Sequence, residues 1–478
     1  MSLTKKITFN TIIHTFGKFT GSAIGVVILG LLARYLGTEG FGYFTTIFAY
    51  LFFFSVIGDL GLYLITINEL GREGVDQKKI YSNIFTIRFV SGLFLMILAS
   101  SLIWFFPYPL LVKFGALIIS ISVFVMMLDQ LIVALFQKEM KTKYAAVAEI
   151  VGKIIYLGLT ILVIKFDAGF LAILWAVVIG LSIHFLINFS FARKLLAFKF
   201  AFDKEIWKNI LKKSWPIATY MIFSMFYFKA DTIILSLYYP AQTVGLYGAP
   251  YKILEVLIAF PAIFMGLVSP HLSRAFSQNN LKDFKRIFQK AFDGFSLIIW
   301  PMIFGMLALA NPIINLIAGK EFIESVPILQ ILIIATGIIF LAHLSTFAVV
   351  AINKQKQMMK YYIFAAVSAL VLYFIFIPKY SFYAAAVVTV IVEFFILIAS
   401  WLMIKKTLKF KTNFTVCLKS LFASVVMFMI LYLTNFGLLF SVILGGLIYL
   451  IIIYLNGALK KELIEKFIKT KTEECWSG

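Results

Sequence analysis

The stretch GKFTGSAIGVVILGLLARYLGTEGFGYFTTIFAYLFFFSVIGDLGL (17–62) shows the unit from which this chain is built. It holds two apolar runs, each with the roughly 20 residues that an α-helix needs to cross a bilayer. A short glycine-rich turn containing Arg34 separates the runs, so we expect two antiparallel neighbouring helices. The runs are continuous and lack period-two alternation, which favours helices over a β-barrel.

The same unit recurs along the whole chain. Of the 478 residues, 62% are hydrophobic and 14% are charged, and the mean hydropathy is +0.99. Soluble domains are typically ~45–50% apolar and ~25% charged. The composition therefore predicts an all-α integral membrane protein without a separate soluble catalytic domain. We count fourteen apolar segments that are long enough to span, with centres near Ile24, Phe54, Leu93, Phe124, Leu157, Val178, Phe226, Leu257, Phe304, Ile334, Val367, Val390, Phe428 and Ile448.

Basic residues concentrate in every second gap between these segments. Numbered from the N-terminus, the even gaps and both tails hold 32 of the 43 Lys and Arg residues, and six more lie within spans. The odd gaps hold only Arg34, Lys113, Lys165, Lys320 and Lys379. Basic residues resist translocation, so the rich side is cytoplasmic. The pattern predicts a multi-pass protein of the cytoplasmic (plasma) membrane with both termini in the cytoplasm, and it attributes the net charge of +21 to topology rather than to nucleic-acid binding.

One even gap is longer than the others and divides the chain. In residues 191–214, the run EIWKNILKK follows Asp203, a plausible N-cap, and it places Ile206, Trp207, Ile210 and Leu211 on one side. This predicts an amphipathic helix on the cytoplasmic headgroups. The predicted organisation is an N-terminal lobe of spans one to six (1–190), the linker (191–214), a C-terminal lobe of spans seven to twelve (215–404), spans thirteen and fourteen (405–456) and a cytoplasmic tail (457–478).

The two lobes share a short internal repeat. GTEGFGYFTTIF (37–48) follows span one, and PAQTVGLYGAPY (240–251) follows span seven. When Gly42 is set against Gly245, each glycine has an aromatic residue within the next two positions. Repeats of this kind are typical of secondary transporters, whose substrate site lies between the repeats near the midplane.

Span one combines two stripes at helical spacing. Gly17, Gly21 and Gly25 form a stripe that lets a neighbouring helix approach closely. His14, Lys18 and Ser22 form a polar stripe about 100° away. The combination predicts a helix with one packed face and one face that lines a hydrated cavity.

Charged residues within the spans need a reason, because a charge at the bilayer centre costs roughly 2.5–3.5 kcal/mol. The bases are Lys18, Arg88, Lys153, Lys229, Lys252 and Lys419, and the acids are Asp59, Asp129, Glu149, Asp231, Glu255 and Glu393. Two pairs can neutralise on their own helices, namely Glu149 with Lys153 and Lys252 with Glu255. Lys419 lies near a cytoplasmic end and can extend its side chain to the headgroups.

Three bases, Lys18, Arg88 and Lys229, have no acid three or four residues away on their own helices. Either they pair across helices with Asp59, Asp129 or Asp231, or they face a hydrated cavity and hold an anionic group. A lipid-linked sugar carries a diphosphate, which several cationic donors would bind. On this second interpretation the predicted substrate-binding residues are Lys18, Arg88, Lys153, Lys229 and Lys252.

Buried carboxylates are the second set of candidates. Asp231 shares a stripe of span seven with Tyr220, Ser224 and Tyr227, and Glu393 is central in span twelve with no basic residue nearby in sequence. An unpaired central carboxylate is a candidate proton or sodium site, and its structural alternative is a protonated, hydrogen-bonded Glu. We predict an ion-coupling role for Asp59, Asp231 and Glu393.

The sequence has no motif for bond-breaking chemistry. It contains no Gly-x4-Gly-Lys-Ser/Thr phosphate loop and no His-Glu-x-x-His pair. Its four histidines are dispersed, and its two cysteines exclude a disulfide framework. We therefore predict no catalytic residue, no metal site and no cofactor.

Three stretches resemble those of a known family: LARYLGTEGFGYFTTIFAYLFFFSVIGDLGL (32–62), ALFQKEMKTKYAAVAEIVGKIIYLGL (134–159) and KADTIILSLYYPAQTVGLYGAPYKILE (229–255). They are similar to segments of the bacterial and archaeal polysaccharide flippases, the O-antigen or lipid-linked oligosaccharide flippase family of the multidrug/oligosaccharidyl-lipid/polysaccharide exporter superfamily. The resemblance implies two six-helix lobes in a V with pseudo-twofold symmetry, two additional C-terminal helices, alternating access, and an undecaprenyl- or dolichyl-diphosphate-linked oligosaccharide as cargo. By position, Lys18, Lys229 and Lys252 match the spans in which relatives carry cavity bases.

The favoured function is translocation of a lipid-linked oligosaccharide from the inner to the outer leaflet for surface polysaccharide synthesis. A polysaccharide polymerase and glycosyltransferases would be its partners. The alternatives are a cation-coupled drug or metabolite antiporter of the same superfamily, a membrane transferase or ligase, and a scaffold for a glycan-synthesis complex. An antiporter would need the buried acids as its cargo site, whereas a transferase would turn over a sugar donor.

Overall fold

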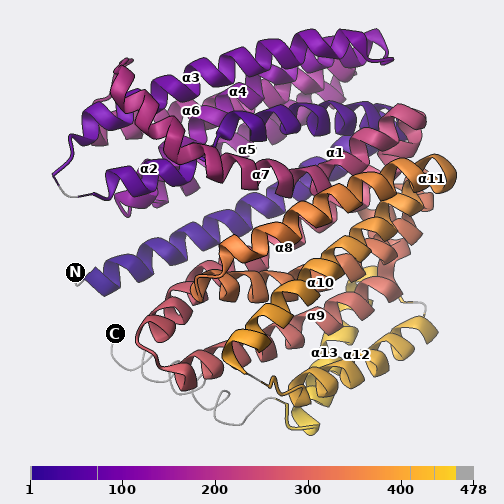
Figure 1. Ribbon diagram of the computed structural model, residues 1–478. Coiled ribbons are helices and arrows are strands. Elements are labelled where there is room, and N and C mark those ends of the chain that lie inside the picture. The colour runs from indigo at the N-terminus through magenta and orange to yellow at the C-terminus, as the bar shows by residue number, and fades with distance from the viewer. Residues whose placement is uncertain (1–2, 73, 410, 435, 459–478) are drawn as a thin grey trace, which may run out of the picture. The chain divides into compact units, whose positions relative to one another are not determined.

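The fold is described by a computed structural model that covers residues 3–72, 74–409, 411–434 and 436–458, with side chains except at 3–16, 19, 216, 217 and 219–228. All regular structure in these residues is helical, as the sequence predicts (Figure 1). The helices are α1 (Leu3–Asp59), α2 (Leu62–Leu70), α3 (Gln77–Leu102), η1 (Ile103–Phe105), α4 (Leu110–Lys138), α5 (Lys143–Lys165), α6 (Gly169–Leu195), α7 (Lys204–Tyr238), α8 (Ala241–Ser277), α9 (Leu281–Ile317), η2 (Lys320–Ser325), α10 (Val326–Ala351), α11 (Gln355–Leu408), α12 (Thr415–Leu433) and α13 (Leu438–Leu455).

Each predicted span centre falls inside one of these helices. Eleven helical segments of the described residues are long and apolar enough to cross a membrane, and two of them contain two predicted spans each. α1 is kinked at Gly37, whose φ of 63° lies in the left-handed region that glycine tolerates. α11 is kinked at Ser381, with a φ of 54°. The all-α membrane class is confirmed, and the count of fourteen stays a prediction.

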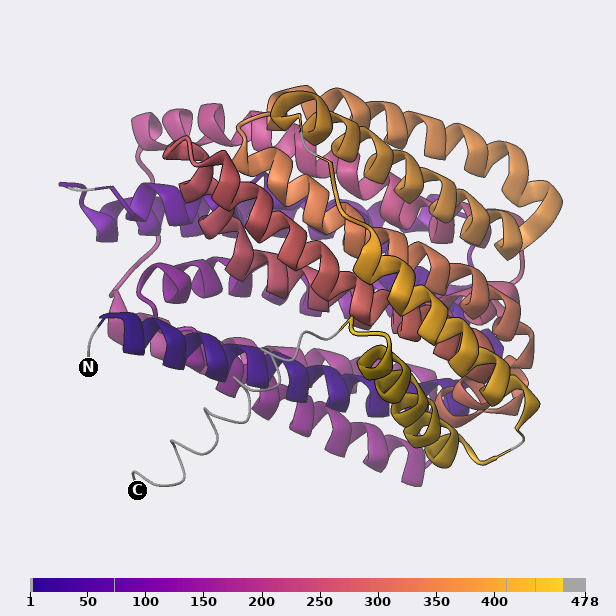
Figure 2. The same cartoon turned by 90° about the horizontal axis from the view of Figure 1, so that it is seen from below.

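The helices form two compact units. One contains the described residues up to Ile253 with Leu316–Ser325 and Tyr362–Thr389, and the other contains Leu254–Asn315, Val326–Tyr361 and the described residues from Val390 onward. In the first unit, α5 packs against α1 and α6, and α6 packs against α4 (Figure 1). In the second, α12 and α13 lie side by side (Figure 2). The predicted division into lobes at 191–214 stays a prediction.

Hydrogen bonds and ion pairs connect gaps of the same parity. Odd-numbered gaps are joined by the contacts Arg34–Leu316, Tyr35–Asp167, Tyr239–Pro378 and Leu246–Ser325. Even-numbered gaps are joined by Lys79–Asp203 and Gln77–Lys138 in the first unit and by Gln289–Asn413 in the second. Gaps of one parity therefore meet at one end of a unit, as a chain that crosses a bilayer repeatedly requires. Which end is cytoplasmic stays a prediction.

The two repeated hairpins pack against each other within the first unit. A Cβ atom at Gly42 would overlap the carbonyl oxygen of Ala241, and a Cβ atom at Gly245 would overlap the carbonyl oxygen of Thr38. Each carbonyl belongs to the residue four positions before the opposing glycine. The contact is thus reciprocal, and both halves of the repeat need glycine for the same close approach.

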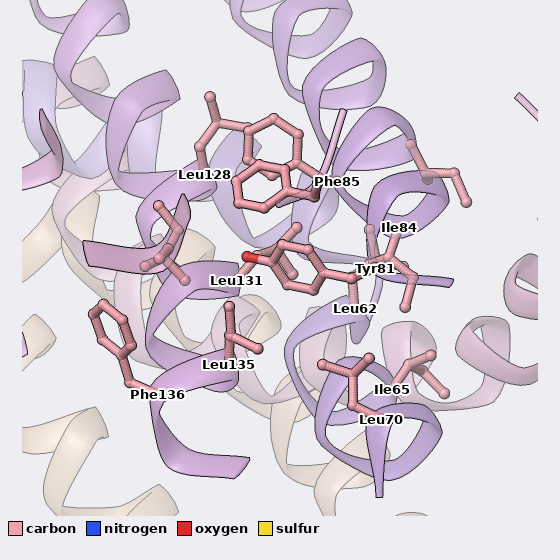
Figure 3. Packing of buried hydrophobic residues seen from close by; sticks show 14 of the residues in the cluster. Leu62, Ile65, Leu70, Tyr81, Ile84, Phe85, Leu128, Leu131, Leu135 and Phe136 are labelled. Carbon is pink, nitrogen blue, oxygen red and sulfur yellow. The ribbon is translucent and has the colours of Figure 1, made fainter. Parts of the chain in front are cut away.

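The linker helix differs from its prediction. Asp203 caps α7, since its Oδ1 accepts hydrogen bonds from the backbone N–H groups of Glu205 and Ile206, but α7 continues without a break into span seven. Its apolar residues Ile206, Trp207 and Ile210 pack on a buried cluster, whose members from α2, α3 and α4 are labelled in Figure 3. Trp207 Nε1 donates to Asn83 Oδ1 at 3.2 Å. Protein therefore covers Ile206, Trp207 and Ile210, whereas Leu211 is 39% exposed, and the position of this helix on the headgroups stays a prediction.

Substitution of Asp203 tests the N-cap of α7. Its ion pair with Lys79, at 2.7 Å, and its hydrogen bonds to the first turn of α7 lower the pKa of the Asp203 carboxyl. A lowered folded-state pKa adds stability above the unfolded-state value of about 3.9, and this contribution is lost as the pH falls through the folded-state pKa. We expect Asp203→Asn to lower the midpoint of thermal unfolding in detergent slightly at pH 7, and Asp203→Ala to lower it further, because asparagine still caps a helix and alanine does not. Equal midpoints for the two variants would contradict the capping role.

Candidate functional site

Two of the predicted substrate-binding lysines meet at one carboxylate. Lys18 on α1 lies 3.1 Å from Glu149 Oε2, and Lys153 on α5 lies 2.9 Å from Glu149 Oε1. Lys153 also donates to the backbone oxygen of Gly21 at 2.9 Å. We call Lys18, Glu149 and Lys153 the lysine cluster. The predicted pairing of Glu149 with Lys153 on one helix is confirmed. The acid that Lys18 meets across helices is Glu149, and not Asp59, Asp129 or Asp231 as the pairing alternative expected.

Small residues of α1 bring the lysine cluster together. A Cβ atom at Gly17 would lie 2.6 Å from the Cβ of Ala146, and one at Gly21 would lie 2.9 Å from Glu149 Oε1. The predicted close approach along the glycine stripe is therefore confirmed for these two positions, and the approaching helix is α5. The glycine stripe also faces the charged groups of α5. The glycine face and the polar face of span one therefore both contact the lysine cluster.

The lysine cluster is open at its two cations. The side chains of Lys18 and Lys153 are 46% and 31% exposed, whereas that of Glu149 is 15% exposed. One carboxylate between two ammonium groups leaves a formal charge of +1. An incoming anion can therefore reach both cations, while the carboxylate holds them in place.

Arg88 and Asp59 form a separate, buried pair. Arg88 Nη1 lies 3.0 Å from Asp59 Oδ1, and the Arg88 side chain is 0% exposed. The other donors of Arg88 are also engaged: Nη1 with the oxygen of Gly58 at 2.6 Å, Nε with the oxygen of Met127 at 2.9 Å, and Nη2 with Gln130 Oε1 at 2.8 Å. This is the cross-helix pairing that the structural alternative expected for Arg88. The pair connects the end of α1 with α3 and α4.

Lys229 and Asp231 lie near each other in sequence on α7 but contact different groups. The Lys229 ammonium lies 4.4 Å from the ring centre of Tyr251 and 5.9 Å from that of Phe52. Asp231 is fully buried; its Oδ2 accepts a hydrogen bond of 2.5 Å from Tyr247, and its Oδ1 accepts one from the backbone N–H of Thr232. The side chains of Tyr220, Ser224 and Tyr227, predicted to share its stripe, lie outside the described residues, as does that of His14 on span one.

The remaining candidates lie on α8 and α11. Lys252 is half-buried, and its predicted pairing with Glu255 stays a prediction. Glu393 is 5% exposed, and no described residue donates a hydrogen bond to its carboxylate. It belongs to the second unit, whereas the other predicted site residues belong to the first.

Sequence reasoning missed a polar cluster between α4 and α6. Asn188 Nδ2 donates to Asp129 Oδ1 at 2.9 Å and lies 3.0 Å from His184 Nε2. His184 Nε2 lies 3.6 Å from Asp129 Oδ2. The available signal was the spacing of His184 and Asn188, four residues apart in an apolar span. That spacing puts both side chains on one helix face.

Comparison with known proteins supplies independent findings. The sequence pattern of a family described as "Polysaccharide biosynthesis protein" matches residues 31–327. A protein of Shigella flexneri named as an O-antigen transporter is 26% identical over 396 residues, which is 79% of this chain and 93% of that protein. A protein of Haloferax volcanii named as the low-salt glycan biosynthesis flippase Agl15 is 21% identical over 307 residues, 62% of each chain.

A solved structure shares the architecture. The lipid II flippase MurJ in an inward closed conformation superposes with a TM-score of 0.79, covering 95% of this chain and 100% of that one at 20% identity. Identity this low establishes the fold and leaves the cargo open. Neither named relative is described as an enzyme.

Proposed function

Because this chain belongs to the polysaccharide biosynthesis protein family, we propose that it is a flippase that moves a polyprenyl-diphosphate-linked oligosaccharide across the cytoplasmic membrane by alternating access. The names of the two relatives, an O-antigen transporter and a glycan biosynthesis flippase, support a glycan cargo. The undecaprenyl and dolichyl carriers, and a polymerase and glycosyltransferases as partners, belong to this proposal. So do the location in the cytoplasmic membrane and the cytoplasmic position of both termini.

The lysine cluster is the observation that carries the proposal. Two partly exposed lysine side chains share one mostly buried carboxylate and sit on helices that are long and apolar enough to cross a membrane. An ammonium has three donors and no acceptor, so each lysine can keep Glu149 while donating to a phosphate oxygen. A diphosphate offers negative oxygens on two linked phosphorus atoms, which suits two neighbouring cations better than a single carboxylate does.

Lys229 and Lys252 complete the proposed anion site. The Lys229 ammonium lies over two aromatic rings, and such cation–π contacts stabilise a cation without neutralising it. Lys252 follows Tyr251 directly in sequence and lies on the same helix. We leave Arg88 and Asp59 out of the anion site and of ion coupling, because their charges and the donors of Arg88 are already engaged with each other and with neighbouring backbone.

We propose Asp231 and Glu393 as the groups that respond to a coupling ion. Both carboxylates are buried, and Asp231 accepts hydrogen bonds from Tyr247 and Thr232. The antiporter alternative uses the same two acids as its cargo site. It therefore predicts that Asp231→Asn and Glu393→Gln abolish transport while the lysines of the cluster are dispensable.

The experiment replaces the two lysines of the cluster. In cells depleted of this protein and complemented with Lys18→Ala/Lys153→Ala, we expect lipid-linked oligosaccharide to accumulate on the inner leaflet. Each hydrogen bond to a charged group contributes about 1.5–3 kcal/mol, so the loss of two should slow flipping by at least about tenfold. The readout is the inner-leaflet fraction of the labelled lipid-linked oligosaccharide.

Two controls accompany this variant. Lys113→Ala/Lys165→Ala removes two lysines that lie over the rings of Trp104 and Phe166, and it should complement fully. The variant Lys18→Ala/Lys153→Ala leaves the buried Glu149 carboxylate without its ion pairs, and adding Glu149→Ala removes that carboxylate. If flipping returned in the triple variant, the defect of the double variant would be one of folding and not of anion binding. Wild-type flipping by Lys18→Ala/Lys153→Ala would refute the proposed anion site and favour the antiporter.

A further inference from the structure

Asp129, His184 and Asn188 form a buried polar cluster that the proposed function does not use. Asn188 is 0% exposed and Asp129 is 8% exposed. The cluster is compact, because the amide nitrogen of Asn188 contacts both Asp129 Oδ1 and His184 Nε2, and the imidazole and the carboxylate lie 3.6 Å apart. A carboxylate and an imidazole rarely remain in a membrane-spanning segment without a functional reason.

In this hydrogen-bond geometry, the Nε2 atom of His184 carries no proton. The Asn188 amide nitrogen has two hydrogens, and it can donate to both neighbours only if His184 Nε2 is an acceptor. A proton added to Nε2 would instead face the Asp129 carboxylate. A second acceptor next to His184 is Asn188 Oδ1, which is buried and has no hydrogen-bond partner among the described residues. A turn of this amide would let Oδ1 accept the new N–H.

Two charged groups of the lysine cluster act on this site. Lys18 and Glu149 act electrostatically on Asp129, and so does His184. Gly152, which precedes Lys153, packs on His184 so closely that a Cβ atom there would lie 2.7 Å from the His184 Cβ. The other described titratable groups on the helices packed against α4 and α6 are Arg34, Tyr35, Glu39, Tyr43, Tyr50 and Asp59 on α1, Tyr63 and Glu69 on α2, Lys78, Lys79, Tyr81 and Arg88 on α3, and Lys143, Tyr144, Lys153, Tyr156 and Lys165 on α5.

We propose that Asp129, His184 and Asn188 form a proton-binding site that controls the anion affinity of the lysine cluster. The inference rests on the proposed function, because it assigns the lysine cluster to a diphosphate. With the proton absent, the negative charge of Asp129 opposes an anion at Lys18. With the proton bound, Asp129 and His184 together are neutral, and the lysine cluster attracts an anion more strongly.

The expected effect is about tenfold in affinity. A unit charge roughly one helix diameter away, ~10 Å, changes an affinity by about this factor at an effective dielectric constant near 20. Histidine is the side chain whose ordinary pKa, about 6.5, places its charge change near neutral pH. Binding should therefore strengthen on going from about pH 8 to about pH 6.

The test measures binding of inorganic pyrophosphate to the purified full-length protein in nanodiscs. The affinity of the wild type divided by that of His184→Gln cancels the protonation of the probe itself. We expect this ratio to rise about tenfold between about pH 8 and about pH 6. Asp129→Asn should bind pyrophosphate more tightly than the wild type at about pH 8, because it lacks the negative charge that opposes the anion. His343→Gln is the matched control, since His343 lies on α10 in the second unit and contacts the oxygen of Ile339. It should keep the wild-type profile.

A second readout does not depend on the probe. Histidine-selective NMR should show one imidazole signal that disappears in His184→Gln and changes its chemical shift with pH in the wild type. That signal should shift in Lys18→Ala, because the two clusters are electrostatically linked.

The outcomes separate the two proposals. A constant wild-type to His184→Gln ratio, or a His184 signal that does not titrate, overturns the proton site. Unchanged pyrophosphate affinity in Lys18→Ala/Lys153→Ala at every pH, or no binding by the wild type, overturns the diphosphate site and leaves the NMR titration to decide the proton site by itself.

Discussion

Replacing Gly42 with alanine should destabilise the protein more than alanine at any open helical glycine. The new methyl group would overlap the carbonyl oxygen of Ala241, which is backbone and can yield only if the hairpin 240–245 moves away. Overpacking of this kind costs about 1–3 kcal/mol. We expect a lower midpoint of thermal unfolding in detergent and weaker complementation in cells. Gly245→Ala should act alike, because its methyl group would overlap the carbonyl oxygen of Thr38.

Matched glycines make this prediction specific. A Cβ atom at Gly158 on α5 or at Gly266 on α8 would meet no atom within 4 Å, so alanine there should be neutral or slightly stabilising. The double variant Gly42→Ala/Gly245→Ala should cost less than the sum of the single variants, because one separation of the hairpins relieves both overlaps. Equal effects at Gly42 and Gly158, or additive effects of the pair, would contradict the reciprocal contact.

Arg88→Ala should be the most destabilising change of a charged residue. It leaves Asp59 buried without its ion pair and removes hydrogen bonds to the oxygens of Gly58 and Met127. Breaking a buried ion pair from one side costs about 3–5 kcal/mol. We expect a severe loss of folded protein in the membrane and a low unfolding midpoint. Arg88→Lys should rescue little, since an ammonium cannot reproduce the fork of donors.

Two comparisons check the origin of that loss. Arg72 pairs with Glu69 at 3.1 Å with its own side chain 55% exposed, so Arg72→Ala should cost at most about 1 kcal/mol. Arg88→Met/Asp59→Asn removes both charges and should recover part of the stability lost in Arg88→Ala. If Arg72→Ala and Arg88→Ala are equally stable, Arg88 is not the structural group described here and returns to the candidates for anion binding.

Several features of the fold could be predicted because they depend on local composition. The apolar runs predict the helices, and the basic residues of alternate gaps predict which gaps share an end of the protein. The contacts Arg34–Leu316 and Lys79–Asp203 agree with that alternation. The N-cap at Asp203 was also predictable, since the capping side chain and the turn it caps are adjacent in sequence.

Charge pairs were predictable only along one helix. The pair Glu149–Lys153 follows from spacing, because residues four apart share a helix face. Spacing says nothing about Lys18, whose acid lies on another helix. For Arg88 the sequence left open a partner among three acids on other helices or a position facing a cavity, and packing of α1, α3 and α4 selected Asp59.

The chain alone indicates which segments are helical and which gaps lie together, because burial of apolar runs and exclusion of basic residues act locally. Tertiary structure decides which buried groups meet. Ile206, Trp207 and Ile210 could pack on lipid or on protein, and in the fold they pack on protein. His184, Asn188 and Asp129 become one cluster only because α6 packs on α4, and Lys18 meets Glu149 only because Gly17 and Gly21 admit α5. Such contacts depend on the distance between helices, which no single helix encodes.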